Sequence, residues 1–118
     1  MCPVDRDIAR RKIERIQENL RLLEPLQDLT VEAYRADPFR RGAVERFLQV
    51  IVEAAVDINS HLLVETGHSA PDDQYSSFIS AGQHGIIDDA IVLASVRVVL
   101  DLYPRYIAAV ERFLSTNA

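Results

Sequence analysis

Cysteine is almost absent from this chain of 118 residues, which contains only Cys2. One cysteine cannot close an internal disulfide or build a zinc site alone, so neither cross-link holds this fold together. Long apolar runs are lacking too: the longest is Ala90–Ala94, whereas a membrane-spanning helix needs about 20 residues. The N-terminal stretch MCPVDRDIARRK mixes charges of both signs without an apolar core. We therefore expect no signal peptide and a cytoplasmic protein.

Basic residues are outnumbered, with 13 Lys and Arg against 18 Asp and Glu and a net charge of −5. Broad, sequence-independent binding to nucleic acid normally needs a basic face, and this balance argues against it. Of the basic residues all but Lys12 are arginine, whose planar guanidinium suits phosphate better than an ammonium does. The arginine usage therefore reflects either genome composition or a local phosphate site on an acidic protein.

Glycine is scarce and no stretch alternates in Val, Ile or Thr, so we expect no strands, whereas apolar residues recur with helical spacing almost throughout. Pro25 is expected to close or bend the first helix, Asp37 and Pro38 to start the longest one, and Gly67 to cap its end. Pro104 is expected to restart the chain as a new helix. We predict an all-α, up-and-down bundle of four to five helices. The expected helices cover residues 5–27, 38–66, 72–81, 88–100 and 104–114, and the short segment 30–36 is expected to form one or two helical turns.

The predicted helix over 88–100 has almost no polar face. A helix that is apolar all round is usually buried, either in a core or in an interface. A chain of this length would leave much of such a helix exposed as a monomer. We therefore expect a homodimer.

Sequence motifs for chemistry are few. There is no glycine-rich phosphate loop, no Gly-x-Ser-x-Gly, and no Cys or His pair at metal-ligand spacing, so we expect neither a cofactor nor a metal. Glu53, Asp57 and His61 recur every fourth residue and share one face of the predicted long helix. They form either a polar or weak metal site, or a hydrogen-bonded cluster in the core or an interface.

Two cations, Arg40 and Arg41, fall in the first turn of the same helix, where the helix dipole disfavours positive charge. Either they mark a site for an anion or an acidic partner, or Asp37 and Glu45 offset their charge. The sequence leaves both interpretations open.

The run DPFRRGAVERFLQVIVEAAVDINSHLLVETG resembles the long central helix of HepT-type HEPN proteins, where a DP–RR–(A/V)ER–LQ–E–D–(N)H pattern recurs. The preceding Arg/Glu/Leu-rich helix and the stretch GHSAPDDQYSSFISAGQHGIIDD are similar to the family as well, so the resemblance covers most of residues 5–89. It implies one HEPN-like helical domain over 1–118 that dimerises. It also implies the toxin half of a HEPN/MNT toxin–antitoxin pair, whose partner antitoxin is an MNT-type nucleotidyltransferase.

The chain departs from the family at its active motif, an Arg followed four to six residues later by His and commonly then by Tyr. Arg97 is present and Tyr103 follows, but no His occurs after His84 and the interval is shorter. In the family the His transfers a proton at the ribose 2′-hydroxyl during metal-independent RNA cleavage, and the Arg holds the phosphate. The resemblance thus implies that Arg97 contacts phosphate but that cleavage is weak or lost, whether through natural degeneration, an engineered deletion or a loop missing from the sequence.

Tyr103 is the nearest match to the tyrosine on which the family's antitoxin places AMP. The alternative is an aromatic residue that packs on the core. The leading functional hypothesis is a toxin-type protein of ribonuclease lineage. The alternative is a non-catalytic helical homodimer that acts only as an interaction module.

Overall fold

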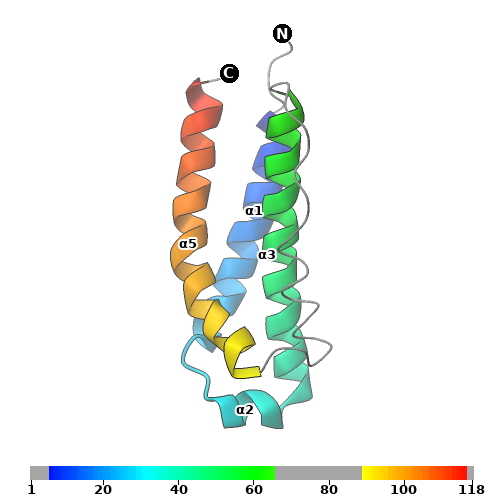
Figure 1. The fold of residues 1–118 in the computed structure, drawn as a ribbon, viewed down its shortest axis with the longest axis vertical. Coiled ribbons are helices and arrows are strands. Elements are labelled where there is room, and N and C mark those ends of the chain that lie inside the picture. The colour runs from blue at the N-terminus through cyan, green and yellow to red at the C-terminus, as the bar shows by residue number, and fades with distance from the viewer. Residues whose placement is uncertain (1–5, 66–88, 117–118) are drawn as a thin grey trace.

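The computed structural model describes residues 6–65 and 89–116, and every element within them is helical. Three long helices lie side by side in an elongated bundle, and a short helix lies across one end (Figure 1). The first long helix runs antiparallel to the other two. The all-α bundle is therefore confirmed, with α1 (Arg6–Leu23), the 3-10 helix η1 (Glu24–Leu26), α2 (Val31–Ala36), α3 (Pro38–Glu65) and α5 (Asp89–Thr116).

The helix ends follow the capping signals of the sequence. Pro25 lies in η1, where α1 has already ended, as expected for a residue that lacks a backbone N–H donor. The hydroxyl of Thr30 accepts the N–H of Ala33 at 3.1 Å and caps α2. Asp37 caps α3, since its Oδ1 accepts two first-turn N–H groups, from Phe39 at 3.0 Å and Arg40 at 3.2 Å. The expected helix over 72–81 and the Gly67 cap lie outside the described residues.

The prediction that the chain restarts at Pro104 is wrong. Residues Asp89–Thr116 form one continuous helix with Pro104 inside it. An interior proline costs about 3 kcal/mol. The cost is offset because the apolar stripe of α5 continues past Pro104 in register, and each buried side chain contributes about 1.5–3 kcal/mol. The buried members of that stripe on both sides of the proline are Val92, Val96, Val99, Ile107, Val110 and Leu114.

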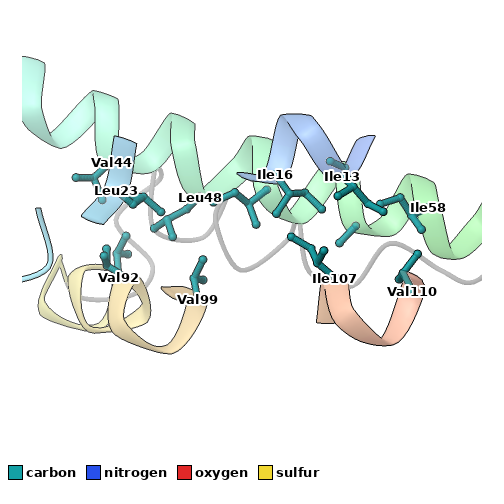
Figure 2. Close-up of a cluster of buried hydrophobic side chains, with 14 of the residues drawn as sticks. Ile13, Ile16, Leu23, Val44, Leu48, Ile58, Val92, Val99, Ile107 and Val110 are labelled. Carbon is teal, nitrogen blue, oxygen red and sulfur yellow. The ribbon is translucent and has the colours of Figure 1, made fainter. Parts of the chain in front are cut away.

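The core lies between the three long helices (Figure 2). It is aliphatic apart from Tyr34, and it runs the length of the bundle as one cluster. Its fully buried side chains come from all three helices, so each helix needs the other two. They include Ile16 and Leu23 of α1, Val44, Leu48, Ile51 and Ile58 of α3, and Val96 of α5.

By length and composition alone, α3 is apolar enough to cross a membrane, a test that core helices of globular proteins also pass. The apolar residues along its middle, among them Leu48 and Ile58, are packed inside the bundle, whereas Phe39 and Val64 near its two ends are exposed. Asp57, on its surface, pairs with Lys12 of α1. In this structure α3 is the central core helix.

The apolar character of α5 is divided between two faces. One face is buried against α1 and α3, as predicted for a helix with little polar surface. The other leaves Ile91, Val98 and Leu102 exposed at 51%, 61% and 51%. These three residues define the outer stripe of α5. The expected homodimer remains a prediction for this surface.

Candidate functional site

Arg97 projects from the exposed side of α5 toward the segment that follows η1. Its Nε donates to the backbone oxygen of Gln27 at 3.2 Å, and its Nη2 lies 3.2 Å from Oδ1 of Asp28. Both charged side chains remain open to solvent, with Arg97 68% and Asp28 87% exposed. The guanidinium is thus oriented by a distant part of the chain yet accessible to a ligand.

The segment that holds Arg97 is itself anchored. The N–H of Gln27 donates to the oxygen of Glu24 at 3.3 Å, and the N–H of Leu29 donates to the oxygen of Leu26 at 3.2 Å. Leu26 and Leu29 pack against the hydrophobic core. The turn therefore fixes the Gln27 carbonyl where Arg97 reaches it.

Tyr103 lies on another side of α5 from Arg97. Six residues at 100° each turn its side chain by about 120° away from that of Arg97. Its ring packs edge-on against Tyr106, with the centroids 5.8 Å apart and the planes at 68°. Tyr103 packs against the core and lines a cavity of about 140 Å³ between α3 and α5, together with Val52, Ala55, Val56, Asn59, Leu102 and Tyr106. The structure does not bring the two predicted motif residues to one face.

Tyr106 fixes the α3–α5 contact beside that cavity. Its hydroxyl donates to Oδ1 of Asn59 at 2.6 Å and lies 3.2 Å from the backbone oxygen of Ala55. Burial, followed by the neighbouring Tyr103, raises the pKa of Tyr106. Its phenol is therefore kept protonated as a structural donor.

Glu53, Asp57 and His61 share a face of α3, as the spacing predicts, but each has a different partner. Gln49 donates to Glu53 at 3.0 Å, Lys12 pairs with Asp57 at 3.1 Å, and Nε2 of His61 lies 3.1 Å from Glu65. Among residues 6–65 and 89–116, no three His, Cys, Asp or Glu side chains are placed to hold a metal ion. The three residues make separate contacts rather than one site.

The arginines at the start of α3 are also engaged by carboxylates. Arg40 lies 3.9 Å from Asp37, so the expected offset by that residue is present. Arg41 pairs instead with Asp89 at the start of α5, at 3.8 Å. Glu45, the other expected counter-charge, accepts a hydrogen bond from a tyrosine hydroxyl. Both arginines therefore have a carboxylate nearby at close to 4 Å.

That tyrosine, Tyr34, belongs to a polar network that the sequence did not reveal. Its ring is fully buried, and its hydroxyl donates to Glu45 over a long 3.5 Å. Burial, and then the charges of Glu45 and Asp89, raise the pKa of Tyr34 above its ordinary value. Asp89 also accepts Arg35 of α2 at 3.4 Å, besides Arg41. The network ties α2, α3 and the start of α5 together, and no local spacing signals such long-range pairs.

No imidazole lies near Arg97 in the described part of the chain. Its one histidine, His61, lies one turn after Asp57, which pairs with Lys12 of α1. Lys12 is about 16 Å of helix length from the end of α1 at Leu23, and Gln27, which Arg97 contacts, lies beyond that end. His68 and His84 lie outside the described residues. The nearest carboxylate on α5, Asp101, pairs with Arg105 at 3.1 Å. The described surroundings of Arg97 thus contain a backbone carbonyl and carboxylates but no histidine.

Comparison with known proteins matches the sequence of this chain to a known family. The chain is 23% identical to the protein named tRNA nuclease HepT from Aphanizomenon flos-aquae (strain 2012/KM1/D3), over 98% of this chain and 96% of that protein. The alignment spans 141 positions, more than the 118 residues here, so that relative has segments that this chain lacks. The family model described as "Ribonuclease HepT-like" matches residues 13–97 and ends at Arg97. Because this match extends over more than half of its residues, the chain belongs to the HepT-like ribonuclease family.

Proposed function

We propose that this chain is the toxin-type component of a HEPN/MNT toxin–antitoxin pair, of metal-independent ribonuclease lineage, and that it binds RNA while cleaving it little or not at all. The observation that carries the proposal is the position of Arg97. The family match ends at Arg97, and the guanidinium of Arg97 is exposed. The sequence has no histidine beyond residue 84. We also propose that the protein acts in the cytoplasm.

Arg97 is the proposed ligand of an RNA phosphate. A guanidinium presents a planar fork of N–H donors that matches phosphate oxygens and stays charged at any working pH. Its side chain is 68% exposed, so a phosphodiester reaches it without rearrangement of the core. Because the cyanobacterial relative is named a tRNA nuclease, we propose tRNA as the RNA.

Proton transfer is the step for which the chain offers no agent. Attack by a ribose 2′-hydroxyl needs a proton acceptor within hydrogen-bond reach, and such a group typically contributes about 10²–10⁴-fold. Arg97 itself stays protonated. Tyr103 lies on another face, and a phenol is a poor base at neutral pH. Asp101 is paired with Arg105 and would repel the phosphate. We therefore propose that catalysis is impaired.

We propose that the functional unit is a homodimer joined through the outer stripe of α5. Ile91, Val98 and Leu102 are each more than half exposed, and they recur on one side of the helix at spacings of seven and four. A stripe of large apolar side chains that water contacts is typical of a surface that a partner covers. Two copies would bury the same stripe against itself, as a two-fold interface requires.

We propose an MNT-type nucleotidyltransferase as the antitoxin partner, docked at the start of α3. Phe39 is 88% exposed there, beside Arg40, whose carboxylate partner is 3.9 Å away. Exposed aromatic and arginine side chains together are typical anchors of protein interfaces. Tyr103 is the proposed acceptor of AMP from that partner.

The test of the proposal measures RNA binding and partner binding separately. Fluorescence anisotropy with a labelled tRNA transcript should show binding that Arg97→Ala weakens, with the salt slope reduced by about one. Co-expression with a neighbouring nucleotidyltransferase gene product should recover a complex that the double variant Phe39→Ala/Arg40→Ala weakens. Unchanged tRNA affinity in Arg97→Ala would contradict the RNA-binding role.

The second candidate function is a homodimer that acts only as an interaction module. The exposed outer stripe of α5 favours it, together with the missing histidine after Arg97. A stable dimer with no measurable tRNA binding would select this function over the first.

A further inference from the structure

We propose that Asp28 is a built-in competitor of the RNA phosphate for Arg97, so that the Asp28–Arg97 pair sets how tightly the chain holds RNA. The inference rests on the proposed function of Arg97 as a phosphate ligand. It assigns a role to a residue outside the family's motif, contributed by the turn after α1.

The contacts of the guanidinium divide it into an occupied edge and an open edge. Nε donates to the Gln27 oxygen and Nη2 to Asp28, both at 3.2 Å, so these two atoms face the turn. A guanidinium carries five N–H donors. No described residue accepts from Nη1, so this nitrogen and the second hydrogen of Nη2 form an open edge that fits two phosphate oxygens.

The two contacts of Arg97 differ in how firmly the accepting group is held in place. The Gln27 carbonyl belongs to the backbone of an anchored turn, whose N–H groups bond back to Glu24 and Leu26. Asp28 is instead a side chain, and it is 87% exposed. An exposed ion pair shifts an equilibrium by about one-and-a-half- to fivefold. The backbone contact therefore keeps Arg97 oriented while the carboxylate is free to move aside.

The charge of Asp28 opposes the ligand that the open edge attracts. A phosphodiester on that edge lies one guanidinium width from the carboxylate, and the two anions repel each other. With Asp28 in place the local charge of the pair is zero; without it the site is a cation held by Gln27. Asp28 thus lowers the affinity of Arg97 for RNA without dismantling the contact that orients Arg97.

The test is a double-mutant cycle on tRNA affinity at low salt. Asp28→Asn keeps an acceptor for Arg97 but removes the charge, and we expect it to tighten tRNA binding by about two- to fivefold. Glu24→Gln is the matched control, since it removes one charge from the same segment and Glu24 forms no ion pair with Arg97. In an Arg97→Ala background the gain from Asp28→Asn should fall to that of Glu24→Gln.

The outcomes separate the inference from the function on which it rests. If Arg97→Ala weakens binding but Asp28→Asn gives the same gain with and without Arg97, or no gain, the competitor role is overturned and the phosphate role of Arg97 stands. If Arg97→Ala leaves tRNA affinity unchanged, both are overturned. Thermal unfolding of each variant checks the fold, which these exposed side chains should leave intact.

Discussion

The inner and outer surfaces of α5 differ in what their side chains contact. The inner face is a continuous stripe of buried apolar side chains, and its packing keeps the helix intact through Pro104. The remaining surface of α5 has two parts: Val98 and Leu102 form an exposed apolar stripe, whereas Arg97, turned by about 100–140° from them, bonds to a turn that lies 69 to 70 residues earlier in the sequence. The inner face carries the helical scaffold, whereas the outward-facing Arg97 is the residue at which the family match ends. One side of a helix can thus hold a fold together while its other sides present residues to ligands and partners.

The largest expected effect comes from rebuilding the outer face. Rebuilding the motif on Arg97, with a polar residue in place of Val98 and His in place of Leu102 in the segment between Ser95 and Pro104, supplies the missing proton acceptor and leaves the buried Val96 and Val99 in place. We expect tRNA cleavage to rise by about 10²–10⁴-fold over the unaltered chain. Gel analysis of a labelled tRNA measures the rate. The same segment with Ala in place of its His should stay at background, and equal cleavage by both versions would refute the missing-base explanation.

The second prediction breaks the proposed interface on the outer face. Val98→Asp would place an unpaired charge in the contact between two copies, and we expect it to weaken the dimer by about 100-fold. Light scattering at micromolar concentration should give twice the monomer mass of 13.3 kDa for the unaltered chain and the monomer mass for the variant. Glu111→Gln, a charge change elsewhere on α5, is the control. A clean 13.3 kDa species for the unaltered chain would exclude the homodimer.

The third prediction compares the same substitution on the two faces. Val96 is fully buried and Val98 is 61% exposed. Val96→Ala removes two buried methyl groups and leaves a cavity, so it should lower the free energy of unfolding by about 2 kcal/mol. Val98→Ala should change it by less than about 0.5 kcal/mol at concentrations where the chain is monomeric. Urea denaturation measures both, and equal losses would mean that the assigned faces of α5 are wrong.

The smallest expected effect concerns the buried tyrosines that hold α5 against its neighbours. Burial raises the pKa of both Tyr34 and Tyr106, so the folded state favours the neutral phenol. Their contribution is complete below about pH 10, the ordinary tyrosine pKa, and is lost as pH rises above it. The free energy of unfolding should therefore fall above pH 10, by at most about 1.4 kcal/mol per pH unit for each tyrosine.

Urea denaturation at a series of pH values from about 8 to about 11 measures this dependence. Tyr34→Phe and Tyr106→Phe should each flatten the decline, because phenylalanine does not titrate. Tyr103, which is only partly buried, provides the comparison. A decline of the same steepness in the double variant Tyr34→Phe/Tyr106→Phe would show that other groups cause it.

Local signals predicted most of the fold. Thr30 and Asp37 cap the helices that they precede, and the apolar spacing located α1 and α3 and divided α5 into two helices. The prediction failed at Pro104 because the local rule for proline does not include the packing of the residues on both sides of it. Tertiary contacts decided that boundary.

The site was less predictable because its contacts join distant segments. The spacing correctly predicted that Glu53, Asp57 and His61 share one face of α3. It did not predict that Asp57 pairs with Lys12 of another helix rather than with the other two residues of that face. Arg97 was identified through the resemblance to the family, whereas its partner Asp28 lies 69 residues away and no motif contains it. Pairs of this kind become visible only when the helices are placed in space.

The central claim is that this HepT-like chain retains a phosphate ligand, Arg97, but has lost the base that cleavage needs. The most direct measurement is tRNA cleavage by the unaltered, purified chain beside its Arg97→Ala variant, under conditions where anisotropy shows the tRNA bound. We predict bound tRNA and cleavage at background for the unaltered chain. Robust cleavage that Arg97→Ala abolishes would contradict the claim.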